Sequence, residues 1–325
     1  AVTCGLAGAQ ATTAYTTPVG YTTKGLIQGF NLTGLNVHSP TIASGDFELT
    51  GSFGNVVTDS DVTFSVVTGR TYVLEIRTGA IAGTVLEVPA ASITGNTITV
   101  SSQVTLQALG LVDGDAYSLR LAPTLEEIFT TSAFPTGILK ASLAAASADN
   151  IWVPNGVGGY DRYFLRSGAF QRITGTTTFV ASPNVPIVYS DGILVQKRDP
   201  GTVNLVTSGE VKKSSSNVVV IQGFNPISIV SPVGVTLRTL GLEDDLKGSL
   251  AVGSADWVWV QQANLSYKKY WRRGTNPLTA TWRDADAAAV DLVGDPVLDG
   301  AILIQRRDPG AVNYDLAVPV SYSNL

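Results

Sequence analysis

The chain has 325 residues, of which 44% are hydrophobic and only 14% are charged, so it has ample apolar surface to bury and lacks the signature of a disordered, highly charged protein. Its formal net charge of −5 gives no signal for binding a polyanion, and the sequence predicts no nucleic-acid partner. A single histidine and a single cysteine exclude most catalysis based on these side chains and every zinc cluster built from them.

Residues 1–18 are predicted to form an extended leader. The sequence contains no methionine, and Ala1-Val2-Thr3 fits the downstream side of a small-residue signal cleavage site, so we expect a bacterial protein that is secreted or displayed on the cell surface. No apolar run approaches the roughly 20 residues that a membrane span needs. Cys4 has no second cysteine in the chain, and it is either a thiol that pairs between subunits or an incidental one.

Strand signals dominate the rest of the chain, as β-branched and aromatic runs that lie close to turn residues. These runs are 71–76, 96–100, 193–196, 217–221, 257–260 and 302–305. Helical pattern is scarce, and its best case is 123–129, where Thr124 is placed to cap one or two turns. We therefore predict a mainly β fold made of tandem sandwich-like or barrel-like domains.

An internal repeat is the strongest feature of the sequence. The stretch Gly-Ile-Leu-Val-Gln-Lys-Arg-Asp-Pro-Gly-Thr-Val-Asn at 192–204 recurs as Ala-Ile-Leu-Ile-Gln-Arg-Arg-Asp-Pro-Gly-Ala-Val-Asn at 301–313. Upstream, 147–152 matches 254–259 at nearly the same spacing, which is typical of a duplicated domain.

A second echo links the front of the chain to the join between the repeats. The pentapeptide Ile-Gln-Gly-Phe-Asn occurs at 27–31 and again at 221–225, and we interpret it as a strand in which the phenylalanine enters a core and the glycine permits close backbone approach. These signals divide the chain into a leader at 1–18, an N-terminal β domain at 19–122, a first β repeat at 123–213 and a second at 214–325.

Several motifs resemble an uncharacterised family of exported, β-rich repeat proteins found in Verrucomicrobia-like bacteria. They are Thr17-Pro18-Val19-Gly20, Ser147-Ala148-Asp149-Asn150, Ser254-Ala255-Asp256, the spaced tyrosines with Tyr270-Trp271-Arg272-Arg273, and the late Gly/Ala-Ile-Leu-Val/Ile-Gln-Lys/Arg-Arg strand. The resemblance covers essentially the whole chain. It implies export and a β fold, and it carries no catalytic residues and no cofactor.

Aromatic residues recur at matching positions of the two repeats. Trp152, Tyr160, Tyr163 and Phe164 correspond to Trp259, Tyr267, Tyr270 and Trp271. With their neighbouring arginines they form either a duplicated core, a protein interface or a stacking face for sugars, and the first two uses are favoured. The candidate subunit-interface residues are Ala1, Val2, Cys4, Leu6, Tyr15, Tyr163, Tyr270 and Trp271.

Other side chains that carry chemistry give weaker signals. His38 is expected to be an exposed loop histidine, because no Gly-x-Ser-x-Gly elbow accompanies it. Asp284, Asp286 and Asp291 belong to an acidic run that is either a weak calcium-site candidate or an exposed loop, since its spacing matches no EF-hand. We predict no cofactor.

These observations favour a structural protein over an enzyme. We expect a subunit of an extracellular filament, sheath or surface layer that assembles head-to-tail with copies of itself, by donation of a strand from the uncharged leader. The alternative is an adhesin that binds carbohydrate or another surface and holds a cell-surface glycan on its aromatic residues.

Overall fold

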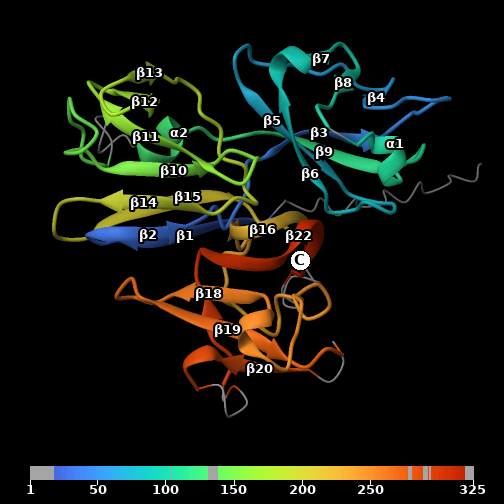
Figure 1. Cartoon of the computed structure of the whole chain (residues 1–325). Coiled ribbons are helices and arrows are strands. Elements are labelled where there is room, and N and C mark those ends of the chain that lie inside the picture. The colour runs from blue at the N-terminus through green and yellow to red at the C-terminus, as the bar shows by residue number, and fades with distance from the viewer. Residues whose placement is uncertain are drawn as a thin grey trace, which may run out of the picture.

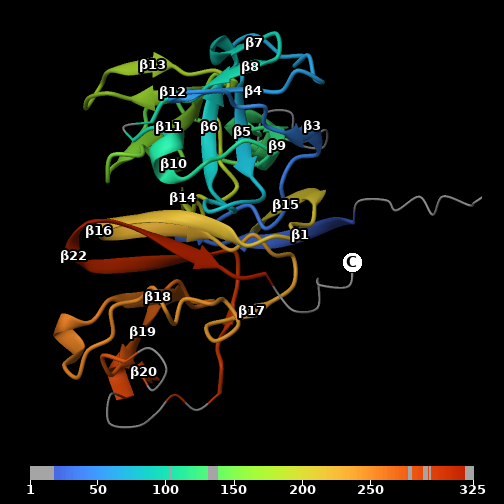
Figure 2. The same ribbon diagram turned by 90° about the vertical axis from the view of Figure 1, so that its right-hand side faces the viewer.

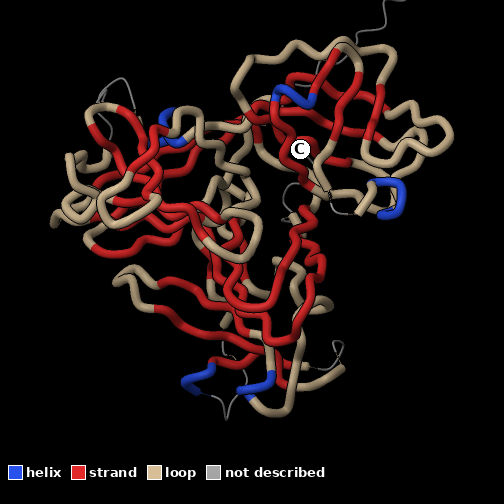
Figure 3. The backbone as a smooth tube through the Cα atoms, turned by 45° about the horizontal axis from the view of Figure 1, so that its top comes forward, coloured by secondary structure: helices blue, strands red, loops and turns tan. Residues whose placement is uncertain are grey.

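The computed structural model describes residues 18–102, 104–130, 138–276, 280–287, 292 and 294–318. The fold is mainly β, as the sequence predicts, and its antiparallel sheets are open and fall into three groups (Figures 1 and 3). Among the described residues, no helix has the length and apolar character needed to span a membrane.

The first group, which we call the inserted module, is built from two small sheets. Its four-stranded sheet has the order β3-β9-β5-β6 and its three-stranded sheet the order β4-β8-β7. The strands are β3 (Thr41–Asp46), β4 (Val56–Thr58), β5 (Thr71–Ile76), β6 (Val85–Pro89), β7 (Ile93–Thr94), β8 (Thr97–Thr99) and β9 (Ala116–Leu121), with η1 (Ala90–Ser92) and α1 (Leu106–Leu109) between them. The core of the module contains Phe47, Tyr72 and Tyr117, which are all buried.

The second group contains the first repeat. A six-stranded sheet has the order β13-β12-β11-β10-β14-β2, and β1 pairs with β15 in a separate two-stranded ribbon. The strands are β1 (Val19–Leu26), β2 (Gly29–Thr33), β10 (Asn150–Pro154), β11 (Tyr160–Arg166), β12 (Ala169–Ile173), β13 (Phe179–Ala181), β14 (Ile193–Lys197) and β15 (Val203–Glu210). Helix α2 (Leu125–Phe129) begins at Thr124 as predicted, because the Thr124 hydroxyl accepts from the Glu127 amide and the Glu127 carboxylate accepts from the Thr124 amide.

The third group is the second repeat. Its five-stranded sheet has the order β16-β22-β18-β19-β20, and β17 pairs with β21 beside it. The elements are β16 (Ser216–Ser228), β17 (Val235–Thr236), η2 (Val252–Ser254), β18 (Trp257–Gln261), β19 (Tyr267–Arg273), β20 (Thr281–Asp284), η3 (Ala285–Ala287), β21 (Val297–Leu298) and β22 (Ala301–Leu316). Strand β16 contacts β14 and strand β22 contacts β2, so the two repeats meet along these strands (Figures 1 and 2).

The strand pairings group the front of the chain differently from the predicted N-terminal domain at 19–122. In the second repeat the long strand β16 pairs along its length with the long strand β22. In the first repeat the equivalent pairing is divided in two, with β1 against β15 and β2 against β14. Strands β1 and β2 therefore belong with the first repeat, and β3 to β9 lie between β2 and α2 as an insertion. Local pattern located these strands, but strand pairing depends on contacts between residues more than 160 positions apart, which pattern does not encode.

The duplication itself explains why both repeats form similar sheets. In β18 the buried Val258 and Val260 alternate with the half-buried Trp257 and Trp259, which gives one face to the core and leaves the other at the surface. In β10 the buried Ile151 and Val153 alternate in the same way with residues of the opposite face. The faces that point away from the two cores are the ones on which the candidate site lies.

Candidate functional site

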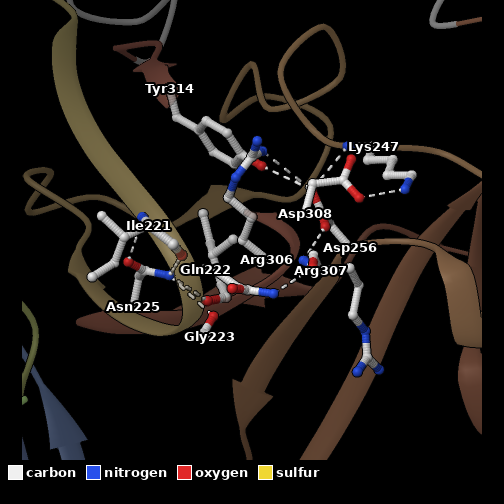
Figure 4. Close-up of polar contacts among 11 residues, drawn as sticks. Ile221, Gln222, Gly223, Asn225, Lys247, Asp256, Arg306, Arg307, Asp308 and Tyr314 are labelled. Atoms are coloured by element: carbon white, nitrogen blue, oxygen red, sulfur yellow. Dashed lines mark hydrogen bonds and ion pairs between the residues drawn. The ribbon is translucent and has the colours of Figure 1, made fainter. Parts of the chain in front are cut away.

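Both repeats bend their long strand at the repeated pentapeptide. Gly29 has a φ of +117° and Gly223 a φ of +103°, a region that glycine adopts without the steric penalty of other residues. The side chain of Asn31 closes the bend, because its oxygen accepts from the Ile27 amide at 3.0 Å and its nitrogen donates to the Ile27 carbonyl at 2.8 Å. Asn225 does the same with Ile221, at 2.9 and 2.8 Å (Figure 4).

This geometry corrects the interpretation of the pentapeptide. Phe30 and Phe224 remain 46% and 48% exposed, so neither enters a core. They lie instead against the tryptophans of the outer sheet face, with ring centroids 5.2 Å apart for Phe30 and Trp152 and 5.7 Å apart for Phe224 and Trp259. A Cβ atom at Gly223 would meet nothing within 4 Å, so this bend requires glycine for its φ angle alone, whereas a Cβ atom at Gly29 would also lie 2.7 Å from Cδ1 of Leu265.

A buried aspartate fixes the loops beside each bend. Asp256 accepts hydrogen bonds from the backbone amides of Lys247 at 3.1 Å and Arg307 at 2.7 Å, and from the Tyr314 hydroxyl at 3.1 Å (Figure 4). Burial and the Asp256 carboxylate raise the pKa of Tyr314. Because this carboxylate is fully engaged with groups of its own repeat, its role is to hold backbone in place.

The first repeat reproduces this arrangement at Asp149. Its carboxylate accepts from the backbone amides of Lys140 at 2.8 Å and Arg198 at 2.6 Å. The two aspartates thus hold Arg198 and Arg307 at matching positions, Arg198 directly after β14 and Arg307 within β22.

The outer face of the second repeat is closed by Trp257. The guanidinium carbon of Arg307 lies 4.5 Å from the centroid of the Trp257 ring, and the Lys269 ammonium lies 5.2 Å from it. Lys269 is also 4.9 Å from the centroid of Trp259. Cations therefore occupy the ring faces that a sugar would need for stacking.

The outer face of the first repeat is open. An open groove of about 660 Å³ runs along it, and the groove is lined in part by Ala145, Trp152, Tyr160, Asp161, Arg162 and Arg198. The Arg162 guanidinium carbon lies 5.8 Å from the Trp152 centroid, and the Asp161 carboxylate accepts from Arg172 at 3.2 Å. The lining of the groove thus combines two aromatic side chains with two arginines and one aspartate.

A buried ionic cluster joins the inserted module to the segment between the two repeats. Glu75 on β5 accepts from Arg120 on β9 at 2.8 Å, from the Ser214 hydroxyl at 2.9 Å and from the Lys212 ammonium. Glu75 and Lys212 are both 1% exposed. Burial alone would raise the pKa of the Glu75 carboxyl, but the charges of Lys212 and Arg120 outweigh it and lower this pKa to about 2. The cluster holds the modules together as one body.

His38 lies beside this cluster and not on an exposed loop, which corrects the expectation from the sequence. It is 5% exposed, its ring centroid is 5.5 Å from that of Tyr189, and its backbone pairs with Glu210 in both directions. Burial, together with the charge of Arg120, lowers the pKa of His38 to about 4. The imidazole is therefore neutral at physiological pH.

The structure buries the aromatic residues that the sequence offered as interface candidates. Tyr163, Tyr270 and Trp271 are 7%, 3% and 2% exposed, so within this chain they pack in the interior and present no surface to a second subunit. Among these candidates, Ala1, Val2, Cys4, Leu6 and Tyr15 lie outside the described residues.

The acidic run does not gather into a metal site within the described residues. Asp284 ends β20 and its carboxylate accepts from the backbone amide of Asp286 at 2.9 Å, an ordinary local turn. Asp291 lies outside the described residues, and within the described part of the chain no three residues among His, Cys, Asp and Glu cluster as metal ligands.

Sequence reasoning missed two features of the site. The ionic cluster brings together Glu75 and Lys212 from distant segments, and its one visible signal was a glutamate inside the apolar run at 71–76. The groove was missed because it depends on a difference between the repeats, with Asn150 at the position of Trp257. Comparison with protein-family models, curated proteins and solved structures finds no match to this chain, so the proposals below rest on its geometry.

Proposed function

We propose that this chain is a structural, non-enzymatic protein of the bacterial cell exterior that assembles head-to-tail with copies of itself into a filament, sheath or surface layer. The observation that carries the proposal is the ribbon formed by β1 and β15. Val19, Tyr21 and Val206 stand on its outer face and are 74%, 75% and 55% exposed. Such exposed apolar side chains on one short ribbon are typical of an interaction surface.

The inner face of the ribbon shows why these side chains point outward. Leu26 and Leu205 are buried in the core of the first repeat, and strand alternation turns their neighbours to the opposite side. Within the described part of the chain, β1 pairs with β15 alone, so its second edge has no strand partner there. An edge of this kind is able to accept an additional strand.

Residues 1–17 of a neighbouring copy have suitable chemistry for that strand. They carry no charged side chain, and an extended segment of this length spans about 56 Å at roughly 3.3 Å per residue. Addition of this segment to the β1 edge would satisfy backbone groups on both sides and cover Val19 and Tyr21. Because donor and acceptor surfaces differ, the contact is head-to-tail, and we propose that successive copies do not close into a ring and so form a linear assembly.

The test compares the full chain with two variants, one lacking residues 1–17 and one carrying Tyr21→Glu. We expect the full chain to elute as a large species in size-exclusion chromatography with light scattering and to form elongated particles in negative-stain micrographs. Both variants are expected to be monomers, because one lacks the donor and the other places a charge on the acceptor.

Val219→Glu is the matched control. Val219 is 63% exposed on β16, the strand of the second repeat that corresponds to β1, and the proposal gives it no contact. This variant should assemble like the full chain. Assembly that survives both the deletion and Tyr21→Glu overturns strand donation, and a monomeric full chain overturns the structural function.

The alternative function, an adhesin that holds a glycan on its aromatic residues, has no support at Tyr270. Tyr270 is buried, so Tyr270→Ala would disturb packing before it disturbed any ligand. The aromatic residues that line an open groove are Trp152 and Tyr160 of the first repeat, and both are half-buried.

A further inference from the structure

The two repeats place different side chains at one equivalent position of their outer sheet faces. Trp257 begins β18, and Asn150 begins β10 at the matching register. The Trp257 indole donates to the carbonyl of Val252 at 2.8 Å, and the Asn150 amide donates to the carbonyl of Ala145, the matching residue, at 2.9 Å. Both side chains thus donate to equivalent carbonyls, but only Trp257 has a ring that lies on the outer sheet face.

That ring has well-defined neighbours in the second repeat. It lies between the guanidinium of Arg307, 4.5 Å from its centroid, and the ammonium of Lys269, 5.2 Å away, and its centroid is 5.8 Å from that of Trp259. The quadrupole of the Trp257 ring attracts the two cations, and the ring also packs against Trp259. In the second repeat these residues therefore form a binding site for an aromatic ring, and the chain's own Trp257 fills it.

The first repeat keeps the same neighbours without the occupant. Arg198 corresponds to Arg307, Arg162 to Lys269 and Trp152 to Trp259, and all three line the groove of about 660 Å³. Arg198 is held in place because its Nε donates to the carbonyl of Ala148 at 3.2 Å. Arg162 is exposed and pairs directly across the sheet from Trp152. Asn150 itself is buried and does not line the groove, which is bounded in part by the counterparts of the residues around the Trp257 ring.

We infer that this groove binds an aromatic side chain, a tryptophan or a tyrosine, of a partner polypeptide. The incoming ring lies against Trp152 between Arg162 and Arg198 and repeats the arrangement that Trp257 makes within the chain. This inference is independent of the assembly through residues 1–17.

Charge and shape favour an aromatic ring over a neutral sugar. A neutral pyranose gains from an aromatic floor but little from two guanidinium groups at its sides, whereas the face of an aromatic ring attracts both. A sugar that carries a carboxylate would also attract arginine, and for that reason it serves as the competing ligand in the test.

The experiment titrates the ¹⁵N-labelled full-length Tyr21→Glu variant, which the assembly proposal expects to be a monomer, with the blocked peptide acetyl-Gly-Trp-Gly-amide and follows the indole N–H signal of Trp152 by NMR. We expect saturable shifts at Trp152 and none at Trp257, whose surroundings are filled. Acetyl-Gly-Leu-Gly-amide should cause no saturable shift. Absence of saturable binding of the tryptophan peptide overturns the proposal, as does equal binding of the leucine peptide.

Three variants locate the binding. Arg162→Ala changes an exposed side chain and should weaken the peptide at least fivefold, while Lys269→Ala, its matched control on the second repeat, should leave the affinity within twofold. Asn150→Trp places at this register the side chain that the second repeat carries, and it is expected to abolish peptide binding. Wild-type affinity in folded Asn150→Trp contradicts the proposed position of the ring, and if this variant does not fold, Arg162→Ala alone decides.

An oligogalacturonate titration completes the design. If the acidic oligosaccharide shifts the Trp152 indole signal and the tryptophan peptide does not displace it, the groove is a site for acidic sugars and the aromatic proposal is wrong. If the peptide displaces the oligosaccharide and binds more tightly, the proposal stands.

Discussion

Asn31 and Asn225 occupy equivalent positions in the two repeats and make the same four hydrogen bonds. Each accepts from the amide of the isoleucine four residues earlier and donates to the carbonyls of that isoleucine, of the bend glycine and of the neighbouring strand. A single side chain thus replaces the backbone pairing that the bend interrupts.

Asn31→Ala and Asn225→Ala are each expected to lower the free energy of unfolding by about 1 to 3 kcal/mol, because each leaves backbone groups at the bend without a partner. Urea unfolding followed by tryptophan fluorescence measures the change. Gln28→Ala is the control, since Gln28 is an exposed member of the same pentapeptide and should change stability by less than about 0.5 kcal/mol. Equal effects at all three positions would show that the asparagines have no special role.

The bend glycines should differ in how well they tolerate alanine. Gly29→Ala and Gly223→Ala both force a Cβ into positive φ, at roughly 1 to 2 kcal/mol. At Gly29 the new Cβ also lies 2.7 Å from Cδ1 of Leu265, whereas at Gly223 it meets nothing within 4 Å. Gly29→Ala is therefore expected to be the more destabilising in urea unfolding, and Leu265→Ala should remove the difference. A larger loss at Gly223 would contradict this account.

The pentapeptide shows how far the sequence determines this fold. Its recurrence, the strand runs and the capped helix at Thr124 are local, because turn residues, side-chain alternation and caps act over a few positions, and the structure confirms each of them. The prediction that its phenylalanine enters a core is wrong. A strand has two faces and turns some apolar residues outward, and the local pattern does not determine which face packs against a core.

The rest of the architecture required long-range contacts. Strand β2 pairs with β14 and so forms the edge of a sheet whose other strands begin at Asn150. The same pairing makes β3 to β9 an insertion. Burial of His38 likewise depends on contacts with Tyr189 and Glu210, which lie in distant segments of the chain. A polar residue in a short apolar loop looks the same in sequence whether it is exposed or enclosed by distant strands.

The ionic cluster should respond unequally to loss of its members. Glu75→Gln leaves the Lys212 ammonium and the Arg120 guanidinium buried together without a carboxylate, and we expect a loss of about 3 to 5 kcal/mol. Lys212→Met should be milder, because Glu75 keeps Arg120. Chemical unfolding of both single variants and of the double variant measures the coupling, which should exceed about 1 kcal/mol. Additive losses would indicate that the two residues stabilise the junction independently.

His38, the single histidine of the chain, should make a contribution to stability that is lost in acid. Its pKa is about 4 in the folded protein, against 6.5 for an ordinary histidine, since burial and then the charge of Arg120 oppose protonation. Between these values the unfolded chain binds a proton that the folded chain does not, so the contribution of His38 to stability decreases as the pH falls from 6.5 to 4, by at most about 3 kcal/mol. Glu75, with a pKa lowered from 4.5 to about 2, adds a further loss below pH 4.5.

His38→Gln isolates this contribution. Burial and the charge of Glu87 raise the pKa of Asp191 to about 7, which acts in the opposite direction because stability then decreases as the pH rises toward 7. Asp191 contributes equally to the wild type and to His38→Gln, so its effect cancels in the difference between their unfolding free energies at each pH. That difference should change steadily between pH 6.5 and 4 and be constant above about 7. A difference that does not depend on pH would mean that His38 is protonated in the folded protein as readily as in the unfolded chain, and that its burial at the junction does not exclude the charged form.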